Sequence, residues 1–191
     1  MKTVTVEQFK SFRPCWLKAA KGREKFARIA ALRNEWTALD VLNLPDVSAQ
    51  DKLWSVLREE FIEAPILHEF ACRCAEYALS FVASPDPRSI AAIEAKRKWL
   101  RGEITGAELY AAWDATARAA TMASAMAAAN AAAWAVAQDA ACAAAQGAAS
   151  RAALDAASHA AMASEIVSGR NAAWDAARKH EVEMLRELLE E

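Results

Sequence analysis

Residues 111–166 read AAWDATARAATMASAMAAANAAAWAVAQDAACAAAQGAASRAALDAASHAAMASEI, and almost every second residue from Ala107 to Arg178 is alanine. No proline interrupts this tract, and glycine occurs in it only at Gly147 and Gly169. Alanine loses no side-chain entropy in a helix, so this composition is the strongest helix former available. An alanine face also lets two helix backbones approach closely. The tract therefore predicts packed helices.

The tract is too long to form one helix. A single helix over residues 107–168 would be roughly 90 Å long, which a compact chain of this size could hardly cover. We therefore expect breaks at Gln146-Gly147 and Ser168-Gly169. This gives one helix to about residue 146, one to about 168 and a last from about 171 to 189, whose amphipathic end EVEMLRELLEE closes the bundle.

Shorter helices are predicted before the tract. Thr5 and Gln8 have the spacing of a capping box for a short helix. Gly22 separates that region from residues 25–42, KFARIAALRNEWTALDVL. In this segment four large apolar residues recur at helical spacing, namely Phe26, Ile29, Leu32 and Trp36. We expect one helix there.

Proline marks the next helix boundaries. Pro65 precedes ILHEFACRCAEYALSFV, residues 66–82, which we expect to form a largely buried helix. Asp86 followed by Pro87 is typical of an N-cap and a first helical position. Four cations crowd the end of the helix that follows, and we expect them to stabilise that end against the helix dipole. They are Lys96, Arg97, Lys98 and Arg101.

Together these patterns predict an all-α helical bundle, with short N-terminal helices packed on long alanine-rich C-terminal helices. We expect an N-terminal helical lobe over residues 1–104 and an alanine-rich long-helix region over residues 105–191, joined in one continuous fold. Thr105 and Glu108 have the spacing of a capping box at the start of the second region.

The charge balance excludes some classes of protein. Lys plus Arg is 23 and Asp plus Glu is 25, with 17 basic and 14 acidic side chains in residues 1–104 against 6 and 11 in residues 105–191. Neither half has the basic excess typical of a nucleic-acid-binding protein. Charged and polar residues interrupt the alanine tract too often for a membrane span. With no signal-peptide pattern and four cysteines expected as free thiols, we expect a cytoplasmic location in a bacterial cell.

His68 and Cys72 are the strongest candidates for chemistry. They lie one helical turn apart on one face, whereas Cys74 points elsewhere. A zinc site needs four ligands and no second ligand pair is visible, so these two residues are weak metal candidates. A Cys72 nucleophile assisted by His68 would also need an orienting group and an oxyanion motif, and neither accompanies them. A core cysteine and a hydrogen-bonded histidine explain the pattern better.

Other catalytic signatures are absent from the sequence. It contains no phosphate-binding glycine loop, no dinucleotide fingerprint, no nucleophile elbow and no zinc-protease motif. A solvated face explains five glutamates around Pro65 better than a di-metal site does. These are Glu59, Glu60, Glu63, Glu69 and Glu76. We therefore expect no enzyme activity, no catalytic residues and no cofactor.

Seven tryptophans are many for 191 residues. Most are expected in the core, because alanine faces need occasional large residues to fill gaps. Tryptophan is also over-represented at binding hot spots. The motif AAWDA occurs twice, so we name its residues Trp113, Asp114, Trp174 and Asp175 as the protein-binding candidates.

Several further motifs carry a resemblance to a known family. They are W-x-x-L-R from Trp54, H-E-x-A-x-x-C-A-E from His68, P-D-P-R from Pro85, A-K-R-x-W-L-R-G-E-I from Ala95 and A-A-W-D-A-A-R from Ala172. On these motifs the chain resembles the alanine- and tryptophan-rich immunity proteins of phages and bacteria (Imm-5-like), from about Leu53 to the C-terminus. The resemblance implies stoichiometric inhibition of a larger protein, and it carries over no catalytic or binding residue.

The functional hypothesis is therefore a non-enzymatic, phage-type inhibitor that binds and blocks a larger bacterial protein. The partner would be a defence effector, as for an anti-CRISPR protein, or a toxin, as for an immunity protein. A structural phage helical protein and a Cys/His or metal-dependent enzyme stay open as alternatives. We also expect a homodimer, since an alanine face on a long helix is hard to cover within one chain. No direct nucleic-acid or membrane partner is expected.

Overall fold

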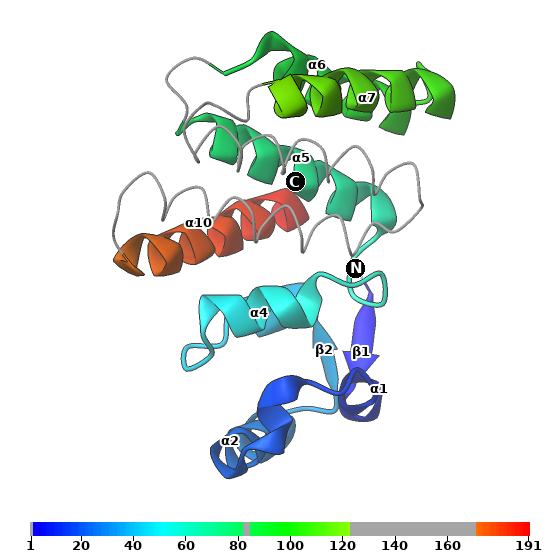
Figure 1. Cartoon of the computed structure of the whole chain (residues 1–191). Coiled ribbons are helices and arrows are strands. Elements are labelled where there is room, and N and C mark those ends of the chain that lie inside the picture. Colours follow the sequence, from blue (N-terminus) through cyan, green and yellow to red (C-terminus); the bar gives the residue numbers. More distant parts are fainter. Residues whose placement is uncertain (1, 82–84, 123–170) are drawn as a thin grey trace.

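The computed structural model describes residues 2–81, 85–122 and 171–191, and this part of the chain is mostly helical (Figure 1). In chain order the elements are strand β1 (Thr3–Thr5), helix α1 (Val6–Ser11), the 3-10 helix η1 (Cys15–Lys18), α2 (Ala20–Ala30), strand β2 (Glu35–Thr37), α3 (Ala38–Leu42), α4 (Ala49–Val56), α5 (Ala64–Leu79), α6 (Pro87–Leu100), α7 (Gly106–Met122) and α10 (Asn171–Glu190). The predicted all-α bundle is confirmed.

Helix starts follow the capping residues that the sequence indicates. Thr5 and Gln8 form a reciprocal capping box at α1. Asp86 accepts a hydrogen bond from the backbone N–H of Arg88, with Pro87 as the first residue of α6. Thr105 and Glu108 exchange backbone and side-chain hydrogen bonds at the start of α7. These bonds satisfy N–H groups that have no partner within the helix, so local chemistry alone sets these three boundaries.

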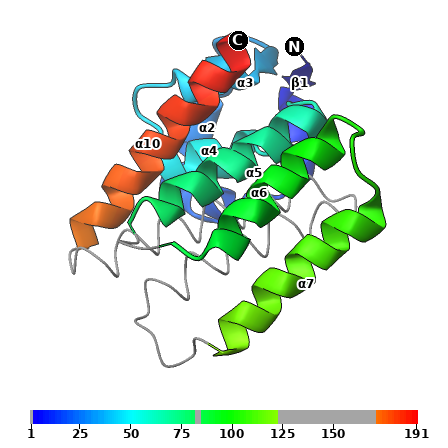
Figure 2. The same cartoon turned by 90° about the horizontal axis from the view of Figure 1, so that it is seen from above.

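The helices pack in a series with α5 in the middle. α10 contacts α3, α4 and α5, while α5 also contacts α6, and α6 contacts α7. Among the described helices, α7 lies at an outer edge, beyond α6 (Figure 2). In Figure 1, α4 lies on the side of α10 that faces away from α5. No helix in the described ranges combines the length and apolarity needed to cross a bilayer.

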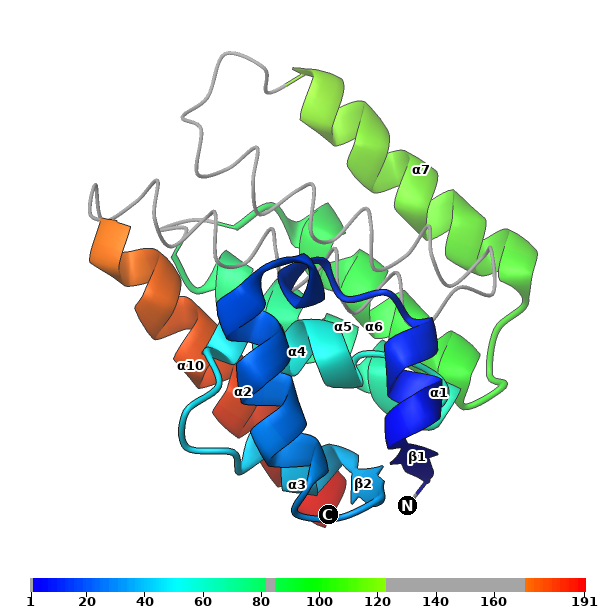
Figure 3. The same ribbon diagram turned by 90° about the horizontal axis from the view of Figure 1, so that it is seen from below.

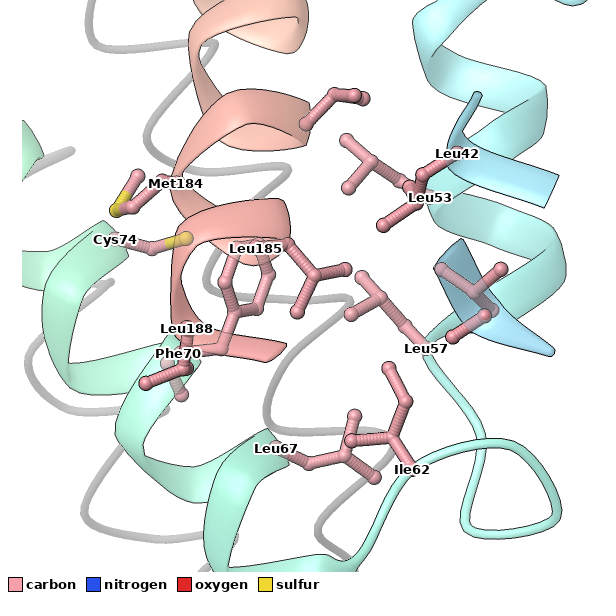
Figure 4. Packing of buried hydrophobic residues seen from close by; sticks show 14 of the residues in the cluster. Leu42, Leu53, Leu57, Ile62, Leu67, Phe70, Cys74, Met184, Leu185 and Leu188 are labelled. Carbon is pink, nitrogen blue, oxygen red and sulfur yellow. The ribbon is translucent and has the colours of Figure 1, made fainter. Parts of the chain in front are cut away.

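The core lies where α4, α5 and α10 meet. Figure 4 shows Leu185 of α10 between Phe70 of α5 and Leu53 of α4. Leu185 and Phe70 are fully buried, and Leu53 is almost so. The apolar stripe of EVEMLRELLEE therefore closes the bundle as predicted, and the described part of the last helix covers Asn171–Glu190.

The expectation of one helix over residues 25–42 is wrong. The chain leaves α2 at Ala30, forms β2 at Glu35–Thr37, and starts the separate helix α3 at Ala38. Trp36 is paired with Val4 in the antiparallel β1–β2 ladder, and its Nε1 donates to Arg33 O at 3.0 Å. Figure 3 shows this small sheet beside α1 and α3. Leu32, assigned to the apolar stripe, is instead 71% exposed.

Gly22 does not separate two helices. It lies inside α2, where a Cβ atom would come within 2.0 Å of the carbonyl oxygen of Trp16. Glycine is therefore required for the close approach of α2 to η1, rather than for a break in the chain.

Part of the alanine tract lies outside the described residues. The breaks expected at Gln146-Gly147 and Ser168-Gly169 fall there, as do the second expected long helix and the part of the first beyond Met122. The described part of the tract begins with α7.

Leu185→Ala should lower the free energy of unfolding by about 2–5 kcal/mol, because it leaves a cavity where three helices meet. Leu32→Ala makes the same chemical change at an exposed site and should cost less than about 0.5 kcal/mol. Urea unfolding followed by circular dichroism measures both. Equal losses in the two variants would contradict this core.

Candidate functional site

The interface between α5 and α6 encloses polar side chains. Lys96 is fully buried and His68 is 5% exposed. Both lie against Trp99: the Lys96 Nζ is 4.3 Å from the indole ring centre, and the His68 ring meets it edge-to-face at 5.9 Å between centres. His68 comes from α5, whereas Lys96 and Trp99 lie one turn apart on α6. Packing of the two helices therefore brings an imidazole and an ammonium to one indole.

Burial sets the protonation of these groups. Burial, and next the positive charge of Lys96, together lower the pKa of His68 to about 4. Burial also lowers the pKa of Lys96 to about 8. The thiol of Cys72 has its pKa raised to about 12, first by burial and then by the charge of Glu69. At pH 7 this interface therefore holds a neutral imidazole and an unreactive thiol.

A half-buried ion-pair network covers the same two helices. Arg97 of α6 donates to Glu69 at 2.8 Å and to Glu76 at 2.9 Å, both on α5. Arg73 contacts Glu69 at 3.7 Å and binds Glu191 at 2.8 Å. The bidentate geometry of Arg97 ties α6 to α5 more firmly than a single surface pair would.

This network corrects the expectation for the cations at the end of α6. Arg97 binds carboxylates of another helix, and Lys96 is buried, so neither acts simply on the helix dipole. The solvated-face explanation holds for Glu59 and Glu60, which are exposed. It does not hold for Glu69, which is half-buried and bound by arginines.

A second set of buried polar groups lies between α5 and α10. Arg178 Nη1 donates to Glu181 Oε2 at 3.0 Å, and both side chains are buried. Burial raises the pKa of Glu181 to about 8, although Arg178 opposes this shift. Burial, and next the charge of Glu181, raise the pKa of Cys74 well above its ordinary value. Cys74 therefore faces α10, whereas Cys72 faces α6.

The metal candidates His68 and Cys72 are both buried on the α6 side of α5. Within the described residues, no three side chains of the His, Cys, Asp and Glu types come close enough to hold a metal ion. The two residues therefore have no third ligand in this part of the chain, and a protonated thiol is a poor metal ligand.

The exposed aromatic surface of the described chain is on α7. Tyr110 is 55% exposed, and its ring contacts the half-buried ring of Trp113 at 4.8 Å between centres. Leu109, next in sequence, is fully buried and anchors this turn. The capping box at Thr105 fixes the start of the helix one turn earlier. Leu109 and the capping box therefore fix the turn of α7 that carries the two rings.

The other binding candidates have different positions. Asp114 is half-buried on α7, and Asp175 is exposed on α10. The side chain of Trp174 lies outside the described part of the structure. Of the four predicted binding residues, Trp113 and Asp114 lie on α7. The ring of Trp113 contacts Tyr110, which the prediction did not include.

The sequence analysis did not identify Lys96 as a buried residue or Tyr110 as a binding candidate. Lys96 follows Ala92 and Ile93 by four and three residues, which is the helical spacing of a buried face. Tyr110 precedes Trp113 by three residues, which places the two rings on one side of a helix. Both spacings can be read from the sequence, but only the packing of α6 on α5 decides that Lys96 is buried.

Comparisons of the chain with protein-family models, with curated proteins and with solved structures found no match.

His68 should make stability depend on pH. Its pKa is about 4 in the folded protein and 6.5 when unperturbed, so between these values the unfolded chain binds the extra proton. Stability from this group is therefore fully present above pH 6.5 and is lost as the pH falls to 4, by about 3 kcal/mol. His68→Gln should remove this part of the pH dependence in urea unfolding measured from pH 4 to 7.

The matched control is His180→Gln, which makes the same replacement at a histidine exposed on α10. If the unfolding free energy of His68→Gln changes with pH between 4 and 6.5 as steeply as that of the wild type, His68 is not a buried neutral imidazole.

Proposed function

We propose that this chain is a non-catalytic, phage-type inhibitor that docks on a larger bacterial protein through the α7 surface formed by Tyr110 and Trp113. The observation that carries the proposal is the Tyr110 ring, more than half exposed and in contact with Trp113. Tyrosine and tryptophan are the side chains that most often supply binding energy at protein interfaces.

The rigidity of α7 supports this role. Leu109 is buried, and the Thr105–Glu108 capping box defines the first turn. A ring on a fixed helix loses little conformational freedom on binding, so more of its contact energy contributes to affinity. Among the described helices α7 lies at an outer edge, beyond α6 (Figure 2), and Tyr110 on it is 55% exposed.

The state of the titratable core groups argues against the enzyme alternative. A neutral, buried imidazole with a pKa of about 4 is a poor general acid or base at neutral pH. A thiol with a pKa of about 12 is a poor nucleophile. The Cys/His pair named as possible catalytic machinery therefore fits a packed interface better than an active site.

The resemblance to phage and bacterial immunity proteins supplies the class of partner. The partner we propose is a bacterial toxin or a defence effector such as a CRISPR nuclease, met in the bacterial cytoplasm. The acidic C-terminal region would favour encounter with a basic surface, such as a nucleic-acid channel. Its charge is modest, so the aromatic surface must provide the affinity.

Tyr110→Ala should abolish partner capture while leaving the fold intact. Truncation of a central aromatic hot spot costs at least about 2 kcal/mol, which is roughly a thirtyfold loss of affinity. Tagged wild type and variant are used as baits in lysates of bacteria that carry toxin and CRISPR systems. Quantitative mass spectrometry then measures the stoichiometry of each captured protein.

The control is Lys98→Met, which alters an exposed side chain at the end of α6 and should capture as the wild type does. Equal capture by Tyr110→Ala would exclude the α7 surface. If the wild type captures no bacterial protein near one-to-one stoichiometry, the inhibitor function is wrong.

A further inference from the structure

The segment that runs from the end of α1 through η1 and α2 is strongly basic. Residues 10–28 carry seven cations and one carboxylate, which gives a net charge of +6. The cations are Lys10, Arg13, Lys18, Lys21, Arg23, Lys25 and Arg28. The balance of 17 basic and 14 acidic side chains over residues 1–104 conceals this segment, because all but two of those acidic residues lie after residue 28.

The charge of this segment is exposed and not neutralised. Six of the seven cationic side chains are exposed, and Lys25 is half-buried. No ion pair among the described residues includes any of the seven. Other arginines of the described chain do have such partners, as Arg97 has Glu69 at 2.8 Å. The seven cations therefore leave a positive surface that a negatively charged partner can neutralise.

Ring contacts hold the three elements of this surface together. Phe9 of α1 stacks on Phe26 of α2 at 5.5 Å between ring centres, and Trp16 of η1 lies 6.0 Å from both rings. The Lys10 Nζ lies 5.9 Å from the centre of the Phe26 ring, which places this cation of α1 beside α2. Figure 1 shows α1 and α2 at the end of the described structure that lies away from α7.

The cations flank the outward face of α2 on two sides. Lys21, Lys25 and Arg28 recur at i, i+4 and i+7, so they share one side of the helix. Arg23 lies on the other side, where it lines a groove of about 320 Å³ together with Lys10. Between the two sides lie three exposed residues: Ala20, Glu24 and Ala27. Because two of these three side chains are methyl groups, α2 can lie close to a flat surface with cations on both sides.

An apolar patch adjoins the basic surface. Leu32, just beyond the end of α2, is 71% exposed. It lines a groove of about 210 Å³ together with Lys25 and Arg28. The other residues that line this groove are apolar except for one aspartate: Ile29, Leu44, Pro45, Asp46 and Val47. A partner that fits this surface therefore offers negative charge and an apolar environment together.

A phospholipid bilayer offers both, whereas a nucleic acid does not fit as well. Phosphates of a duplex would attract the cations but would gain nothing from an exposed leucine. Single-stranded nucleic acids bind largely by stacking their bases on aromatic rings. In this region Phe9, Trp16 and Phe26 contact one another instead.

We propose that this surface binds an anionic phospholipid bilayer, with α2 along the membrane plane, its cations at the lipid phosphates and Leu32 between the headgroups. A cluster of about four to eight lysines and arginines on a helix is typical of binding to anionic lipids. The expectation of no membrane partner depended on the lack of a spanning segment, and surface binding needs none. Because α7 lies at the other end of the described structure, this site is separate from the proposed protein-binding surface (Figure 1).

The test is co-sedimentation of the intact chain with vesicles of equal parts phosphatidylglycerol and phosphatidylcholine. The wild type should sediment with these vesicles and not with vesicles of phosphatidylcholine alone. Added salt should weaken the binding, because it screens charges at the surface. Leu32→Ala should weaken it about tenfold, since much of the leucine side chain then no longer enters the bilayer.

Two triple variants locate the surface. The first replaces three exposed cations beside α2: Lys10→Gln, Lys21→Gln and Arg28→Gln. Each cation near an anionic bilayer strengthens binding about fivefold, so this variant should bind about a hundredfold more weakly. The control removes the same charge from exposed positions elsewhere: Lys98→Gln, Arg101→Gln and Lys179→Gln. It should bind as the wild type does, and circular dichroism checks that both variants fold.

Three outcomes would overturn the proposal. The wild type would fail to sediment with phosphatidylglycerol vesicles, or the two triple variants would lose binding equally, which would assign it to the net charge of the chain. The third outcome comes from fluorescence anisotropy with a labelled DNA duplex. Tighter binding to the duplex than to the vesicles, unaffected by Leu32→Ala, would make a nucleic acid the partner of this surface.

Discussion

The burial of α5 on two opposite faces is the constraint on which the rest of the structure depends. One face, with Phe70 and Cys74, packs on α10 (Figure 4), and the other, with His68 and Cys72, packs on α6. The fully buried small side chains of this helix allow both neighbours to approach closely. On one side of these two interfaces α4 packs on α10, and on the other side α7 packs on α6. The position of α7 at the outer edge therefore depends on the packing of α6 on α5.

The same constraint explains why polar groups are enclosed. When both faces of a helix are covered, residues that would reach water on a surface helix must be neutralised or bonded within the protein. His68 becomes neutral, Cys72 stays protonated, and Arg178 pairs with Glu181. The buried imidazole and thiol are thereby poor acids, bases and nucleophiles at neutral pH. The recognition that we propose depends instead on α7, where Tyr110 is exposed.

Local patterns in the sequence were sufficient for the starts of α1, α6 and α7 and for the fold class. The capping boxes at Thr5 and Thr105 join residues three apart, so no distant contact decides them. Trp36 shows the limit: its spacing fits a helix, yet pairing with Val4, thirty-two residues away, makes it a strand residue. Lys96 shows a second limit of prediction from local patterns. A lysine near a helix end is usually solvated, and only the packing of α6 on α5 buries this one.

Native-state hydrogen exchange tests the central position of α5 most directly. If α5 is the helix on which the others depend, its amides between Leu67 and Ala78 should exchange only through global unfolding. Their exchange free energy should then equal the unfolding free energy from urea, while amides of α2, a helix with no fully buried side chain, exchange through smaller openings. If α5 amides exchange at a lower free energy than those of α2, the account is contradicted.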